Sequence, residues 1–171
     1  LCITSNVNIT KLNTFRRSTQ DATIRIRLSD MVYYTIMSAV NGIDEFKTRI
    51  VDGSPVLFET IHAGFTYIPK GRNLHCNCIT SYSENFSVFR QNIQTAREEA
   101  DKSPTLTPED GDKQNVVYMS NLPNLFFTSL SNPWGDPNED TVPRILFGKM
   151  LASSNGEMII PVSIEVLHSF V

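Results

Sequence analysis

His168 is the residue in this sequence best suited to acid–base chemistry, and it follows the apolar run 159–167. Imidazole has an unperturbed pKa near neutrality, so a histidine facing a cleft can take a proton from a hydroxyl without a large pKa shift. The end of a strand would also hold the ring in a defined position. One histidine defines no site, however, and an ordinary strand-end histidine is the simpler reading of this stretch alone.

The hydrophobic period indicates the strands that must position this histidine. Alternating or continuous apolar residues predict strands at 2–9, 46–51, 56–61, 125–129, 145–151 and 158–167. Asp52-Gly53 and the Ser-Ser-Asn-Gly stretch at 153–156 are typical of hairpin turns. These turns predict that 46–51 pairs with 56–61 and that 145–151 pairs with 158–167.

Helical spacing predicts helices in two further segments. The first is 28–40, and the second begins after Ser81 or Ser83 as N-cap. In the second helix, Phe86, Phe89, Ile93 and Ala96 are expected to face inward, and Arg90, Arg97, Glu98 and Glu99 to lie on other faces. The stretch 101–115, rich in Pro, Asp, Thr and Lys, predicts a loop. Together these segments predict an α+β sandwich of helices on one sheet.

Composition agrees with one soluble domain over residues 1–171. The chain is 40% hydrophobic and 19% charged, which is enough to bury one sizeable core. A net charge of −3 with scattered basic residues disfavours a nucleic acid or an anionic membrane as partner. The longest apolar runs also fall short of the roughly 20 residues that a membrane-spanning helix needs.

Three cysteines, Cys2, Cys76 and Cys78, leave one thiol unpaired in any disulfide scheme. An odd number fits a reducing compartment, so a cytoplasmic location is expected. The stretch His75-Cys76-Asn77-Cys78 invites a metal site. Zinc sites, however, usually space their cysteines by two to four residues and recruit a second cluster, so no metal is expected.

Seven motifs resemble, in their order, those of the chloramphenicol acetyltransferases. The similarity covers nearly the whole chain and implies that family's fold, a two-layer sandwich with a mixed sheet covered by helices. His168-Ser169-Phe170-Val171 resembles the start of the family's HxxxDG motif, so the Asp-Gly pair is expected beyond the end of this chain. Leu1-Cys2 resembles a family position inside the first strand, so the family sequence is expected to extend beyond the start as well. The motifs are Asp44-Glu45-Phe46, Ile50-Val51-Asp52-Gly53, Phe65-Thr66, Leu125-Phe126-Phe127-Thr128-Ser129, Asn132-Pro133-Trp134, Gly148-Lys149 and Pro161 through His168.

The resemblance implies an O-acetyltransferase that moves an acetyl group from acetyl-CoA, a co-substrate rather than a permanently bound cofactor, to a small-molecule hydroxyl such as that of chloramphenicol. His168 would be the general base in a ternary complex, and a serine hydroxyl would stabilise the oxyanion. Matching the motif that ends at Ser129 selects that serine. Counting back from Pro133-Trp134 falls instead on Leu130, which leaves Ser131 as the alternative.

The resemblance also implies binding residues and an assembly. Lys149 and Trp134 match coenzyme-binding positions, although a solvated charge and a core anchor are the alternatives. Residues that fall near acceptor-pocket positions are Phe127, Leu146, Leu74 and His75. A homotrimer is expected, with each site between neighbouring subunits; the near-continuous apolar character of 159–167 agrees with a strand covered on both faces.

Departures from the family pattern keep two other functions open. Leu146 stands where the family usually has a threonine that helps hold a water, and 135–142 is shorter than its family counterpart. A dihydrolipoamide acyltransferase-like enzyme would share the histidine chemistry but accept a thiol. A non-catalytic, ligand-binding relative would keep the fold alone.

Overall fold

The computed structural model describes residues 1–20, 25–108, 113–136 and 140–170. Its helices are α1 (Thr10–Ser18), α2 (Leu28–Asn41), α3 (Asp44–Lys47) and α4 (Phe86–Lys102). Its strands are β1 (Cys2–Asn8), β2 (Thr48–Val51), β3 (Ser54–Leu57), β4 (His62–Tyr67), β5 (Cys76–Thr80), β6 (Val116–Leu122), β7 (Arg144–Gly148), β8 (Leu151–Ala152) and β9 (Met158–Glu165). None of the helices in these ranges is long and apolar enough to cross a membrane.

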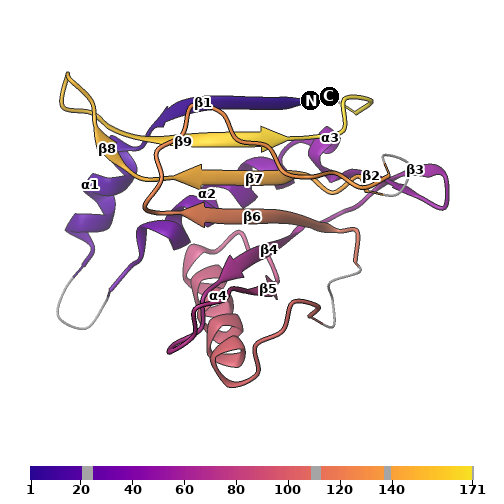
Figure 1. Ribbon diagram of the computed structural model, residues 1–171, viewed down its shortest axis with the longest axis horizontal. Helices are drawn as coiled ribbons and strands as arrows, with labels where there is room; N and C mark the ends of the chain where they lie inside the picture. Colours follow the sequence, from indigo (N-terminus) through magenta and orange to yellow (C-terminus); the bar gives the residue numbers. More distant parts are fainter. Residues whose placement is uncertain (21–24, 109–112, 137–139, 171) are drawn as a thin grey trace.

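One large sheet organises the molecule, with strand order β1-β9-β7-β6-β4-β5 and with β8 paired to β9. The β4–β6 and β6–β7 pairs are parallel, whereas β1–β9, β7–β9 and β4–β5 are antiparallel. Helices α1, α2 and α4 lie behind this sheet in Figure 1, and β2 and β3 form a separate hairpin. The predicted α+β class with a mixed sheet and helices is confirmed.

The core lies between the sheet and the helices, as the helical spacing predicts. On α2 the residues Val32, Tyr33, Met37 and Val40 are buried, and on α4 so are Phe89, Ile93 and Ala96. One face of each helix therefore packs against the sheet, which is the usual reason that amphipathic segments remain helical in a folded chain. Tyr33 contacts the rings of Phe65 and Phe147, each at 5.3 Å between centroids.

The prediction that Arg97 faces away from the core is wrong. Its guanidinium is nearly buried between α4 and α2, where it pairs with Asp30 at 2.7 Å and lies 5.5 Å from the Phe65 ring centroid. A carboxylate from the other helix makes this burial possible, since a buried charge needs a partner. Periodicity within α4 alone could not identify that partner.

Element boundaries also differ from the predictions. The α4 helix is capped by Asn85, whose Oδ1 accepts hydrogen bonds from Ser87 N and Val88 N, rather than by Ser81 or Ser83. The predicted strand 46–51 begins only at Thr48, because α3 takes the preceding residues, and the strand predicted at 56–61 ends at Leu57. The predicted hairpin turns at 52–53 and 153–156 are both present, since β2 pairs with β3 and β8 with β9.

The predicted strand at 125–129 is absent. Residues 123–136, which we call the crossing segment, leave the end of β6 and run over the face of the sheet opposite the helices (Figure 1). The amide of Lys149 donates to Leu125 O at 2.7 Å, and the Phe127 ring lies over Gly148. A Cβ at Gly148 would overlap that carbonyl oxygen and lie 2.7 Å from Pro161 Cγ, so only glycine leaves this room.

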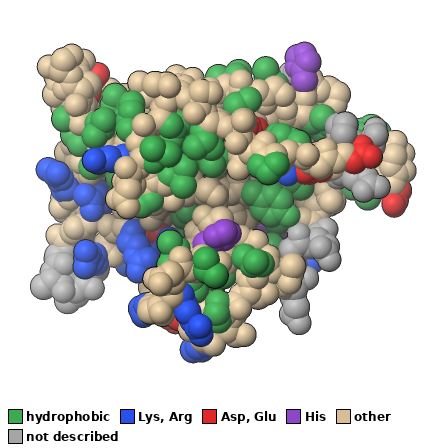
Figure 2. Space-filling model, viewed as in Figure 1, with side chains coloured by type: hydrophobic (Ala, Val, Ile, Leu, Met, Phe, Trp, Pro, Cys, Tyr) green, Lys and Arg blue, Asp and Glu red, His purple; other side chains and the backbone are tan. Residues whose placement is uncertain are grey.

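Strand β9 is thereby covered on both faces within one copy of the chain. Ile160 packs in the core on the helix side, and on the other side Ser163 and Glu165 are buried beneath the crossing segment. The apolar run of β9 is therefore explained without a neighbouring subunit. Figure 2 shows this second face, where hydrophobic side chains gather over the crossing segment and the strands beneath it.

The two described ends of the chain lie side by side (Figure 1). The Leu1 amino group donates to Val166 O at 2.9 Å, and Val166 N donates to Leu1 O at 3.0 Å. This pair of bonds continues the β1–β9 ladder by one step and places His168 directly beyond the end of the sheet.

Candidate active site

His168 lies in a short turn after β9, where Phe170 N donates to Leu167 O at 3.1 Å. The side chain is exposed at the sheet end where β9 finishes and β7 begins, because Glu165 and Arg144 are paired across these two strands. An exposed histidine in a turn that follows directly on a strand is accessible to a bound molecule, as a residue that exchanges a proton must be.

The two serines considered for the oxyanion role flank one anchored peptide. Ser129 and Ser131 are both exposed on the crossing segment. Between them, Leu130 O accepts a hydrogen bond of 2.7 Å from Ser163 Oγ on β9 and lies 3.5 Å from Cys2 Sγ on β1. The structure thus places both serines on a backbone that is fixed to β9, the strand after which His168 follows.

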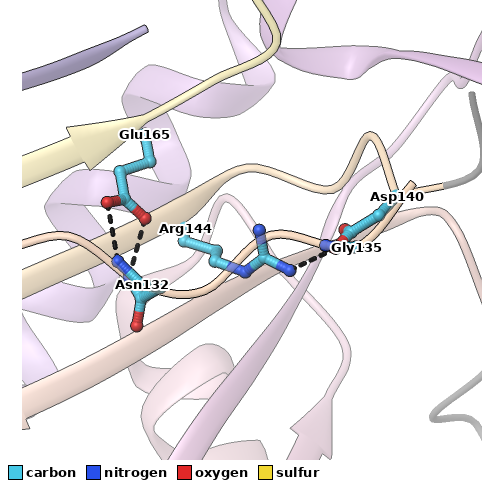
Figure 3. Close-up of polar contacts among 5 residues, drawn as sticks. All are labelled: Asn132, Gly135, Asp140, Arg144 and Glu165. Carbon is cyan, nitrogen blue, oxygen red and sulfur yellow. Dashed lines mark hydrogen bonds and ion pairs between the residues drawn. The ribbon is translucent and has the colours of Figure 1, made fainter. Parts of the chain in front are cut away.

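A second contact to β9 follows two residues along the crossing segment. Glu165 Oε1 accepts from Asn132 N and Oε2 accepts from Asn132 Nδ2, each at 2.8 Å, as Figure 3 shows. Glu165 is 1% exposed, so these bonds replace the hydration of a buried carboxylate. Asn132 and Glu165 thereby fix the crossing segment to the sheet.

Trp134 lies on the guanidinium of Arg144, with 4.1 Å between the Arg144 Cζ and the ring centroid. The same guanidinium is ion-paired with Asp140, which also accepts from Gly135 N at 2.9 Å (Figure 3). The flat face of the indole and the planar cation suit such stacking. Trp134 therefore has a defined position near the start of β7, at the same sheet end as His168.

A cavity of about 520 Å³ opens on this face of the sheet, between the crossing segment and the 106–108 loop. Its volume is in the range of small-molecule sites. Of the four predicted acceptor-pocket residues, Leu146 lines this cavity. Gly64 also lines it, and the absence of a side chain at Gly64 leaves room for the Tyr118 ring. The lining is part polar and part apolar, and its polar side chains include Thr66, Asn77, Tyr118, Ser120, Asn132 and Arg144.

The other predicted binding residues lie elsewhere in the subunit. Phe127 is buried on Gly148 and does not line this cavity. Leu74 and His75 are exposed in a separate groove of about 430 Å³ beside the start of β5. Lys149 borders a groove of about 330 Å³ next to α2, beyond the opposite end of β7 from Trp134. One copy of the chain thus holds the two serines on a segment fixed to β9 and Trp134 near the sheet end beyond which His168 lies, whereas these residues lie elsewhere.

Sequence reasoning missed two contacts of this region, that of Glu165 with Asn132 and that of Arg144 with Asp140 and Trp134. A signal existed, because Glu165 is the one charge in an apolar run and a charge in such a strand needs a partner. Asn132 precedes Pro133-Trp134 in the family motif. Asn132 and Glu165 are 33 residues apart in the sequence, so no local pattern relates them.

The cysteine stretch belongs to the core rather than to a site. Cys76 and Cys78 are both buried on β5, and burial raises the pKa of Cys78 to about 12. A thiol held in its protonated form is a poor metal ligand. In the described ranges, no three His, Cys, Asp or Glu side chains gather closely enough to hold a metal ion.

Comparison with known proteins assigns the family. The family model described as chloramphenicol acetyltransferase matches residues 1–171. The chain belongs to this acyltransferase family. The chain is 26% identical to a chloramphenicol acetyltransferase of Bacillus pumilus over 164 residues, covering 96% of this chain and 72% of the relative. It is 23% identical to chloramphenicol acetyltransferase 3 of Escherichia coli, covering 98% of this chain and 76% of that one.

Solved structures agree on the fold. A chloramphenicol acetyltransferase structure superposes with a TM-score of 0.88 at 22% identity, covering 100% of this chain and 80% of the other. The dihydrolipoamide acetyltransferase of Azotobacter vinelandii reaches a TM-score of 0.77 at 12% identity, covering 100% of this chain and 74% of the other. The two enzyme types therefore share the architecture described above, and the fold alone does not choose between them.

Proposed function

We propose that this acyltransferase is an O-acetyltransferase that transfers the acetyl group of acetyl-CoA to a hydroxyl of chloramphenicol or a similar small molecule. The family match over residues 1–171 carries this proposal. The exposed His168 in the turn after β9 supports it, because an accessible imidazole can act as the general base. No permanently bound cofactor and no metal is needed for this chemistry, and a cytoplasmic location is part of the proposal.

In the proposed mechanism both substrates are bound together. His168 removes the proton from the acceptor hydroxyl, and the oxygen attacks the thioester carbonyl of acetyl-CoA directly. The negative charge that develops on the carbonyl oxygen is stabilised by the Ser129 hydroxyl, with Ser131 as the alternative. Collapse of the tetrahedral intermediate releases the coenzyme thiolate, and the acetyl group never becomes attached to the protein.

Coenzyme binding is proposed to use Trp134 and Lys149. Trp134 offers a flat ring for the apolar arm of the coenzyme, and its stacking on Arg144 keeps that ring in place. The exposed Lys149 ammonium suits a phosphate. Because these residues lie at opposite ends of β7, a coenzyme that touches both within one subunit would have to follow that strand.

A coupled thiol-release assay tests the proposed function. The protein mixed with acetyl-CoA and chloramphenicol is expected to release free coenzyme thiol at a rate that depends on both substrates. Release with dihydrolipoamide but not with the hydroxyl acceptor would favour the thiol-accepting alternative. Binding of the acceptor without any thiol release would favour a ligand-binding relative and contradict the proposal.

We also propose a homotrimer with sites between subunits. The edge strand β1 supports an interface, since Ile3 and Val7 on it are 57% and 42% exposed. The separation of Leu74, His75 and Lys149 from His168 supports sites completed by a neighbour. Light scattering at micromolar concentration is expected to give three times the subunit mass. A fully active monomer would refute shared sites.

A further inference from the structure

Glu165 is a buried carboxylate at the end of an otherwise apolar strand. Removing an ionised carboxylate from water is costly unless hydrogen bonds replace its hydration. Here the replacement comes from one residue, because the backbone N–H and the side-chain amide of Asn132 each donate to a different carboxylate oxygen at 2.8 Å. Arg144, which is paired with Glu165 across β7 and β9, has other side-chain partners, because its guanidinium pairs with Asp140 and stacks on Trp134.

In the structure the carboxylate of Glu165 accepts from both donor groups of Asn132, so the donors and acceptors match completely. A glutamine of the same shape would turn an NH2 group toward the Asn132 side chain, which can bond to it only by turning its amide over to present Oδ1. Glu165→Gln therefore preserves size and packing, but it replaces two charge-assisted hydrogen bonds by neutral ones and requires the Asn132 amide to turn.

The stretch held by Glu165 carries the serines of the proposed mechanism. Ser163, two residues earlier on β9, holds Leu130 O, and Glu165 holds Asn132. Ser131 lies between these two anchored residues, and Ser129 directly precedes them. His168 follows Glu165 by three residues. One strand thus fixes both the peptide with the hydroxyls and the turn with the imidazole.

We propose that Glu165 is a positioning residue: its carboxylate, through Asn132, sets the place of the oxyanion-stabilising serine relative to His168. This inference rests on the proposed acetyl transfer. Glu165 itself touches neither substrate in this assignment. It acts through the crossing segment, whose misplacement would weaken an interaction made in the transition state.

The first test is Glu165→Gln. We expect kcat to fall about tenfold, because neutral hydrogen bonds to Asn132 are weaker than those of the carboxylate, while the KM for acetyl-CoA and for the acceptor stays within about twofold. A general loss of folding would instead lower the amount of active protein. Thermal unfolding and active-site titration of the same sample separate these effects. Unchanged kcat in this variant would overturn the proposal.

The second test exchanges donor and acceptor between the two residues. In the double variant Glu165→Gln with Asn132→Asp, the Oε1 atom of the introduced glutamine can accept from the backbone N–H, and its Nε2 can donate to the new carboxylate. Net charge is unchanged, and we expect kcat to recover to within about threefold of the wild type. A double variant as slow as Glu165→Gln would show that the carboxylate is needed at position 165 itself and would overturn a positioning role.

A control and a second readout keep the test independent of the proposed function. Glu157→Gln removes the charge from a similar contact, since Glu157 Oε2 accepts from Asn155 Nδ2 at 2.8 Å in the exposed 153–157 turn, and it is expected to leave kcat unchanged. Amide hydrogen exchange over 130–136 should be about tenfold faster in Glu165→Gln and recover in the double variant. Wild-type exchange rates in Glu165→Gln would overturn the positioning role, whatever the activity of the variant. If the variants show the expected exchange rates but the wild-type protein transfers no acetyl group, the proposed function alone is refuted.

Discussion

Replacing His168 by alanine is expected to lower kcat at least about 10²-fold, the lower end of the effect of general acid–base catalysis. The physical reason is that a neutral hydroxyl is a weak nucleophile and loses its proton only as the bond to the thioester carbon forms. The base therefore acts mainly in the transition state, and its removal changes kcat far more than ground-state binding. Steady-state rates with acetyl-CoA and an active hydroxyl acceptor measure this effect.

Two further measurements make this result specific. The affinity for the acceptor and for the coenzyme should stay within a few-fold, since the exposed imidazole contributes little to the core. The unfolding temperature should change little for the same reason, because surface substitutions away from buried contacts have small effects. Retention of more than about a tenth of the wild-type rate would exclude His168 as the general base.

Replacing Ser129 by alanine is expected to lower kcat by roughly 10²-fold with little change in either KM. A preorganised hydroxyl lowers the energy of the developing oxyanion, and its interaction with the planar thioester of the ground state is weaker. Ser131→Ala is the matched control, because both serines flank Leu130 and both are exposed. It should leave the rate close to that of the wild type.

The opposite outcome is equally informative. If Ser131→Ala is the slow variant, the oxyanion role belongs to Ser131, and the alignment of the motif that ends at Ser129 is wrong. If neither variant is slower than the wild type, neither serine stabilises the oxyanion, and the proposed serine mechanism is wrong. Because Leu130 O is anchored to Ser163, neither substitution is expected to move the backbone.

Much of the fold can be predicted from local patterns. The strand at β1, the helix at α2 and the hairpin turn at 52–53 all follow from residue order, and the turn has the positive φ angles of Asp52 (51°) and Gly53 (73°) that such a hairpin requires. These features depend on residues within a few positions of one another. The last strand is of the same kind, although β9 ends at Glu165 rather than at residue 167 and His168 lies in the turn that follows it.

The sequence by itself determined the fold class, the family resemblance and the choice of His168 as a candidate base. Only the tertiary structure decided the course of 123–136, because the apolar residues near Phe127 pack on Gly148 instead of pairing as a strand. It likewise decided that Arg49 is fully buried, with its guanidinium donating to backbone carbonyls including Val116 O at 2.7 Å, and that burial lowers its pKa to about 10. Whether a charged residue can be buried depends on partners that folding brings from distant parts of the chain, as it brings Asn132 to Glu165.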